Sequence, residues 1–65
     1  MAVDEALRRL EEEDARVAQV VMLRFFAGIS VEDTAQALDI SPRTARRDWA
    51  YGKAWLLEAM RDEER

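Results

Sequence analysis

The residues with the clearest chemical potential are the arginines that follow the Ser41-Pro42 dipeptide. Arg43, Arg46 and Arg47 lie directly beyond it. A guanidinium group bonds guanine edges or phosphate oxygens in a bidentate manner. Serine is a preferred N-cap, and proline suits the first position of a helix, where its missing amide costs no hydrogen bond. The pattern therefore predicts a helix that begins at Pro42 and carries basic side chains on its first turns.

The composition excludes most catalytic and metal chemistry. The chain contains no His and no Cys, so it has no disulfide, thiol nucleophile, imidazole base or zinc-finger ligand set. Glu32 and Asp33 are adjacent acids, but they stand at the expected start of a helix, where negative charge suits the helix dipole. We therefore expect no enzymatic activity, no bound metal and no cofactor, and we expect binding to be the function.

The distribution of charge points to one basic segment. The chain has 10 Lys and Arg against 14 Asp and Glu, a net charge of −4, which by itself argues against a nucleic-acid partner. Residues 41 to 53, however, carry a net charge of +3, whereas residues 1 to 40 carry −5. Arginines on an exposed helix face are often only a solvated surface. Their position on the first turns of a helix that follows a tight turn favours DNA contact instead.

The apolar periodicity and the turn residues predict an all-α fold. A chain of 65 residues forms one small domain, and one Pro, two Gly and no alternating strand pattern leave little material for a sheet. No segment resembles a membrane span or a signal peptide, so we expect a cytoplasmic protein. The expected helices cover residues 3 to 13, 15 to 27, 31 to 38 and 42 to 60, and the last two form a helix-turn-helix.

The predicted helix ends depend on a few residues with special backbone preferences. Gly28 supplies the left-handed residue that ends the second helix. Ser30 and Asp33 have capping-box spacing and open the third helix. Asp39 occupies the left-handed position of the next turn, where glycine is favoured, at a cost of about 1 kcal/mol. Ile40 follows in the same turn, and its side chain is expected to be buried as a plug between the last two helices.

The faces of the last helix follow from a period of about 100° per residue. Arg43 and Arg47 fall opposite the stripe expected in the core, which is Ala45, Trp49, Gly52 and Leu56. Gly52 costs about 1 kcal/mol in a helix interior, but it allows close approach of a neighbouring helix. Trp55 flanks the stripe and is expected to cover the first helix.

The second helix is apolar on nearly every side, which is typical of a central helix. Its core stripe is Val17, Val21 and Phe25. Met22 and Phe26 share a different side, and we interpret them as core residues that pack on the first helix; the alternative is a groove for a protein partner. In the third helix, Thr34 is expected at the edge of the core with its hydroxyl bonded into its own helix.

The chain resembles the C-terminal domain, called region four, of bacterial extracytoplasmic-function sigma factors. The resemblance depends on LRFFAGISVEDTA at residues 23 to 35 and LDISPRTA at residues 38 to 45. The continuation RRDW at residues 46 to 49, with AWL at residues 54 to 56, is similar to a sigma-70-like subgroup. The departures from the family pattern are Thr34, Asp39 and Gly52.

The resemblance implies a specific set of contacts. Residues that match the family's contacts with the promoter −35 element in the major groove are Arg43, Thr44, Arg46 and Arg47, whereas Tyr51 and Lys53 match positions near the DNA backbone. The implied partners are double-stranded promoter DNA, the β-subunit flap of RNA polymerase on the apolar surface of the first two helices, and an anti-sigma factor. A sigma factor also needs a domain for the −10 element, so we expect residues 1 to 65 to be a fragment of a longer protein.

Two alternatives remain open from the sequence. Response-regulator output domains of the LuxR type share part of the same framework, but they end the recognition helix sooner and add a dimerising helix. The other alternative is a helical protein-interaction module without DNA function, which would use Met22, Phe26 and the acidic first helix.

Overall fold

The computed structural model describes residues 2 to 61, and within that range every regular element is a helix. The predicted all-α fold is therefore confirmed. None of these helices is long and apolar enough to cross a membrane. The elements are α1 (Val3–Glu13), α2 (Ala15–Val21), the π-helical turn η1 (Met22–Phe26), α3 (Val31–Leu38) and α4 (Pro42–Arg61).

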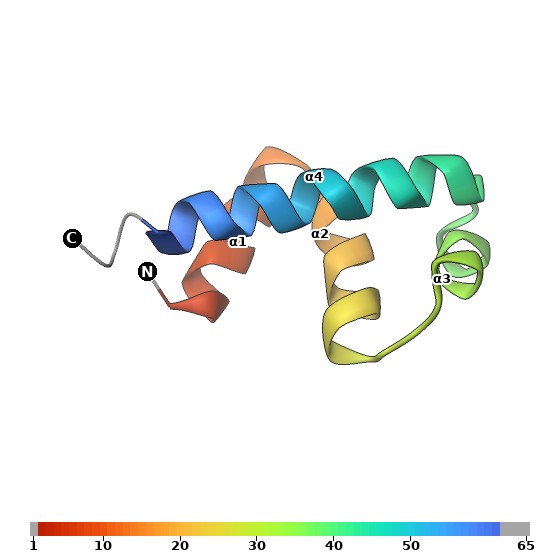
Figure 1. Ribbon diagram of the computed structural model, residues 1–65, viewed down its shortest axis with the longest axis horizontal. Helices are drawn as coiled ribbons and strands as arrows, with labels where there is room; N and C mark the ends of the chain where they lie inside the picture. The colour runs from red at the N-terminus through yellow and green to blue at the C-terminus, as the bar shows by residue number, and fades with distance from the viewer. Residues whose placement is uncertain (1, 62–65) are drawn as a thin grey trace.

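Helix α4 runs along the length of the molecule, and the other helices lie along it in turn (Figure 1). Its 20 residues give a rod of about 30 Å. α1 contacts its C-terminal half, α2 its middle and α3 its first turns, and α1 also packs on α2. The central position predicted for the second helix is confirmed, since α2 packs against both α1 and α4.

The core lies where α1, α2 and α4 meet. The buried residues at this junction are Leu10, Val17, Ala18 and Val21, with Leu7, Trp49, Trp55 and Leu56 packed against them. The predicted core stripe of α4 is confirmed, because Ala45 and Gly52 are buried and Trp49 and Leu56 are half-buried.

Gly52 is where α2 and α4 approach most closely. A Cβ atom added there would collide with Cγ2 of Val21 and would lie 3.1 Å from Cγ1 of Val17. Both valines are buried. The missing side chain therefore lets the two backbones come together, as the sequence led us to expect.

The second predicted helix does not continue as an α-helix to residue 27. After Val21 the backbone widens into the π-helical turn, whose closing amide at Ala27 donates to the carbonyl of Met22. A turn closed by i to i+5 bonds rotates less per residue than an α-helix, so the α-helical period no longer predicts which side chains face inward. Phe25, expected on the core stripe, is 65% exposed, and Met22 and Phe26, interpreted as core, are 48% and 53% exposed. All three core predictions are wrong.

The predicted caps are present. The Ser30 hydroxyl accepts a hydrogen bond from the amide of Asp33 over 3.1 Å, which is the serine half of the expected capping box. Gly28 and Asp39 both take left-handed backbone angles, with φ of 67° and 56°. Asp14 also caps α2 by accepting from the amide of Val17, which separates α1 from α2 without a glycine.

Thr34 differs from its prediction. Its residue surface is fully buried, and Oγ1 has no hydrogen-bond partner among the described residues. The expected bond into its own helix is wrong, because the hydroxyl faces the core. Ile40, predicted to be a buried plug, is half-buried.

Candidate nucleic-acid interface

The start of α4 is fixed by Ser41. Its hydroxyl accepts a hydrogen bond from the amide of Thr44 over 3.1 Å and donates to the Thr44 hydroxyl over 3.0 Å. Pro42 occupies the first helical position, where no amide donor is needed. Because Thr44 Oγ1 accepts from Ser41, its own hydrogen remains available to an outside acceptor such as a phosphate oxygen. The helix end therefore offers ordered donors and the positive end of the helix dipole.

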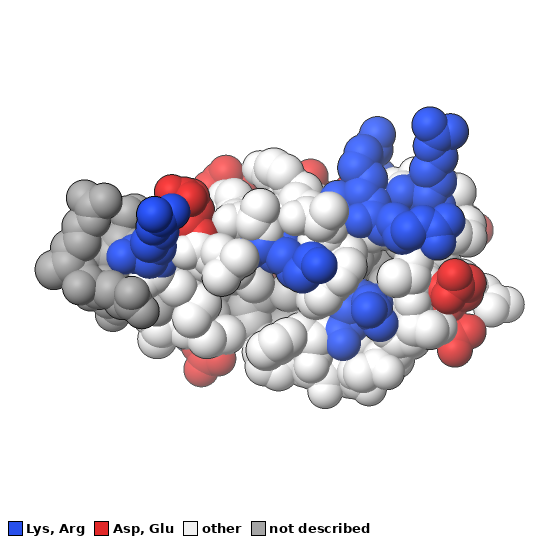
Figure 2. Space-filling view, viewed as in Figure 1, with Lys and Arg blue, Asp and Glu red and all other residues white. Residues whose placement is uncertain are grey.

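Arg43 and Arg47 lie on the face of α4 that points away from the core, and both are exposed. Figure 2 shows basic side chains gathered at the end of the molecule where α4 begins, two of which project well beyond the surrounding surface. Ala50 and Ala54 continue the same face and are also exposed. Small side chains beside long arginines leave room for close approach to a groove.

Arg46 lies at the edge of this face that borders α3. Its Nη1 atom is 3.7 Å from Oε2 of Glu32 on α3, and both side chains are largely exposed. An exposed pair at this distance contributes at most about 1 kcal/mol. Arg46 can therefore exchange Glu32 for a phosphate or a base at low cost.

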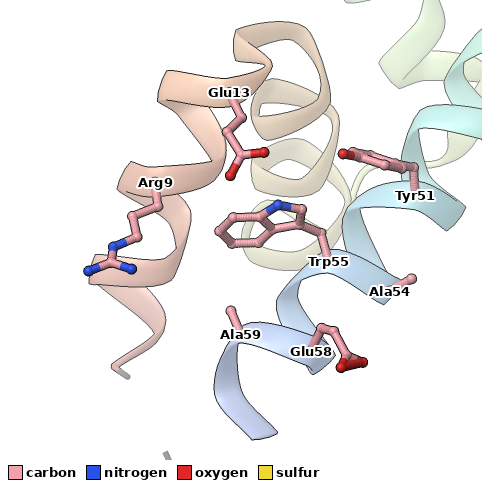
Figure 3. A pocket seen from close by; sticks show the side chains of 7 residues that line it. All are labelled: Arg9, Glu13, Tyr51, Ala54, Trp55, Glu58 and Ala59. Atoms are coloured by element: carbon pink, nitrogen blue, oxygen red, sulfur yellow. The ribbon is translucent and has the colours of Figure 1, made fainter. Parts of the chain in front are cut away.

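Tyr51 and Lys53 diverge to opposite sides of α4. The Lys53 ammonium is 5.1 Å from the ring centroid of Trp49, a cation–π distance. Tyr51 lines an open groove between α4 and α1, in which the Glu13 carboxylate and the Trp55 indole also lie (Figure 3). Trp55 thus covers α1, as expected. The six candidate residues therefore do not form one patch. Four share the helix start, namely Arg43, Thr44, Arg46 and Arg47, whereas Tyr51 and Lys53 flank the helix further along.

Arg24 ties the turn before α3 to α4. Its Nη1 atom donates to the carbonyl of Ile29 over 2.7 Å, and its guanidinium carbon is 5.2 Å from the Trp49 ring centroid. The sequence pattern had singled out Arg24 only as part of the family resemblance. These two contacts link η1, the turn before α3 and Trp49 of α4.

An ion pair between Arg16 and Asp48 was missed by the sequence reasoning. Nε of Arg16 donates to Oδ2 of Asp48 over 2.7 Å, and Nη2 donates to Oδ1 over 3.3 Å. The hydrogen bond and the charge of Asp48 raise the pKa of Arg16. A signal was available, because Asp48 stands three residues after Ala45 and four before Gly52, a spacing that places it beside the core stripe.

An apolar groove lies on another side of the molecule, between α1, η1 and α4. Its volume is about 390 Å³. Phe26, Leu57 and Met60 line it and are exposed, and Phe25 forms an edge-to-face pair with Phe26 at a centroid distance of 5.1 Å. Met22, the other candidate partner residue, lines a separate shallow groove with Leu7 and Ala18.

Comparison with known protein families identifies a match over nearly the whole chain. A family model described as ECF sigma factor matches residues 1 to 62. No curated protein and no solved structure matches the chain.

Proposed function

We propose that this chain, which belongs to the ECF sigma factor family, is the region-four domain that recognises the promoter −35 element. Members of this family are not enzymes; they bind RNA polymerase core and promoter DNA in transcription initiation. The observation that carries this proposal is the pair of exposed arginines, Arg43 and Arg47, on the outer face of the first turns of α4. A recognition helix enters the major groove by this end.

Each candidate residue has a role in this proposal. Arg43 and Arg47 read guanine edges through bidentate hydrogen bonds. Thr44 and the first amides of α4 hold a phosphate, and Arg46 joins them after leaving Glu32. Tyr51 and Lys53 lie beside the DNA backbone rather than on base edges.

The test is fluorescence anisotropy with a duplex that the 65-residue chain selects from a randomised library. We expect weak, sequence-preferring binding, because few phosphate contacts are available and the acidic remainder repels DNA. Replacement of Arg43 and Arg47 by Ala should abolish the sequence preference. A matched control replaces Arg8 and Arg9, two exposed arginines of α1, and should leave the preference unchanged. An unchanged preference in the Arg43 and Arg47 variant would refute base reading by this helix.

The proposed polymerase contact is the β-subunit flap on the exposed apolar side chains of the first helices, Met22 and Phe26 among them. A pull-down with the purified flap tests it. Replacement of Met22 and Phe26 by Ser should abolish capture, whereas the arginine variant should still be captured. Capture that survives the loss of both apolar side chains would refute the assignment. An anti-sigma factor could occlude either surface, and the proposed upstream domain for the −10 element would belong to the same polypeptide.

The alternatives make different predictions. The LuxR-type alternative requires a recognition helix that ends early and a separate dimerising helix, but α4 is continuous from Pro42 to Arg61 and the family match is to sigma factors. It also predicts self-association, which sedimentation measures. The interaction-module alternative predicts flap binding without any detectable DNA binding.

A further inference from the structure

Two close contacts between α2 and α4 each depend on a single residue of α4. At one, Gly52 lies against Val17 and Val21. At the other, one helical turn nearer the arginines, Asp48 is bonded to Arg16 from the first turn of α2. The Arg16–Asp48 pair therefore adds a directional polar contact to the apolar packing of α2 on α4, at a different position along α4 from Gly52. The direction in which α4 presents its first turns therefore depends on the Arg16–Asp48 pair as well as on packing.

Asp48 carries a charge that opposes DNA binding. It is the only acidic residue among residues 41 to 53, and it directly follows Arg47. Charges act over about 8 Å at physiological salt, so an uncompensated carboxylate here would weaken the field of the neighbouring guanidinium groups. Asp48 is also only 4% exposed, so water does little to screen its charge.

We propose that Arg16 is a positioning residue for DNA binding that acts through Asp48. Its guanidinium cancels the carboxylate charge beneath the arginine face, and its two hydrogen bonds hold the middle of α4 at one angle to α2. The proposal rests on the proposed function, since it concerns how the DNA-binding helix is presented. Arg16 acts from α2 and makes its bonds to protein, not to DNA.

The bidentate geometry supports this role over that of an ordinary surface pair. Both carboxylate oxygens of Asp48 accept from Arg16, so the planar guanidinium fixes the rotation of the carboxylate as well as its distance. The Arg16 side chain is 45% exposed, so it extends from the protein surface to the buried carboxylate of Asp48. A lysine could supply the charge but not the two parallel bonds.

The experiment compares Arg16→Gln with the double variant Arg16→Gln/Asp48→Asn, using anisotropy on the selected duplex at a temperature where circular dichroism shows every variant folded. We expect Arg16→Gln to weaken binding about tenfold at both low and high salt, because the Asp48 carboxylate that it leaves unpaired is buried and is therefore screened little by salt. The double variant, which has no local charge, should bind within about twofold of the unmodified chain at each salt concentration. Arg16→Lys, which keeps the charge but not the two parallel bonds, should bind more tightly than Arg16→Gln and more weakly than the unmodified chain.

Two results would overturn the proposal. Binding of Arg16→Gln equal to that of the unmodified chain would show that the pair has no effect on presentation. A double variant as weak as the single variant would show that the unpaired charge of Asp48 does not cause the loss, and would overturn charge cancellation by Arg16.

Urea unfolding separates failure of this inference from failure of the proposed function. If the unmodified chain selects no duplex, the proposed function fails, and the Arg16–Asp48 coupling is then measured by a double-mutant cycle. A coupling of about tenfold in the unfolding equilibrium constant would support the view that the Arg16–Asp48 pair holds α4 against α2. Additive effects of the two substitutions would overturn it whether or not DNA binds.

Discussion

Gly52→Ala tests whether close approach of α2 and α4 dominates the energetics of this domain. Helix propensity alone predicts that the substitution stabilises α4 by about 1 kcal/mol. The structure predicts instead that the substitution lowers the free energy of unfolding. The new methyl group would collide with Cγ2 of Val21, a buried β-branched side chain with one strongly preferred rotamer in a helix, so it cannot turn away.

The expected magnitude is the difference between two terms. Overpacking a well-filled core costs about 1–3 kcal/mol, and the propensity gain returns about 1 kcal/mol. The net loss is therefore between about 0 and 2 kcal/mol, and its midpoint of about 1 kcal/mol corresponds to a fall in melting temperature of about 4–8 °C for a domain of this size. The two predictions are well separated because they differ in sign.

The assay is thermal unfolding followed by circular dichroism, with urea unfolding to confirm an unchanged m-value. Ala50→Gly, at an exposed position of the same helix, measures the propensity term alone and should cost about 1 kcal/mol. In a Val21→Ala background the collision with Cγ2 is removed and only the 3.1 Å approach to Cγ1 of Val17 remains, so Gly52→Ala should there be less destabilising than in the unmodified chain. A higher melting temperature for Gly52→Ala in the unmodified chain would refute the reasoning.

Four further predictions follow from single residues. Thr34→Val should raise stability by about 1–2 kcal/mol in urea unfolding, because it removes a buried hydroxyl without a partner, while Thr34→Ser should lower it. Asp39→Gly should stabilise by up to about 1 kcal/mol, since φ of 56° is strained for any residue with a Cβ; an unchanged urea midpoint would contradict this. Ser41→Ala should cost about 1 kcal/mol and speed amide exchange at Thr44, and unchanged exchange would argue against the cap. The pKa of Arg16 is raised, so the stability that its charge contributes is fully present below the usual arginine pKa and is lost only as the pH rises above it. The stability difference between the unmodified chain and Arg16→Gln should therefore stay constant from about pH 7 to pH 10. A difference in melting temperature that changes over this pH range would contradict this.

The helix boundaries were predictable wherever a local residue decides them. Ser30, Ser41, Gly28 and Asp39 act within a few bonds of themselves, so their types in sequence are enough to place the helix ends. The stripe of α4 was equally predictable, because a straight helix repeats with a constant period. Both kinds of inference need no knowledge of distant segments.

The failures have a common physical origin in the π-helical turn and in long-range pairing. The period used for Phe25 holds only while each residue advances by the α-helical step, and η1 changes that step without an obvious sequence marker such as proline. The partner of Asp48 lies 32 residues away, beyond the reach of a periodicity argument. Of the candidate site, the arginine face and the divergence of Tyr51 and Lys53, which lie about 200° apart on the helix, both followed from the period. The groove that Tyr51 shares with α1 depended on a neighbour from another helix.

The unbroken course of α4 has a consequence for how two partners are arranged. Arg47 on the proposed DNA face and Leu57 in the apolar groove are ten residues apart on one helix, a separation of about 15 Å along its axis. If Arg47 contacts the promoter and the apolar groove contacts the polymerase, as proposed, α4 sets the distance between the two partners. One residue inserted between Arg47 and Leu57 would lengthen α4 by only about 1.5 Å but would rotate one end of the helix against the other by about 100°. The arginine face and the apolar groove would then each keep their own residues but would no longer point in their original directions relative to each other.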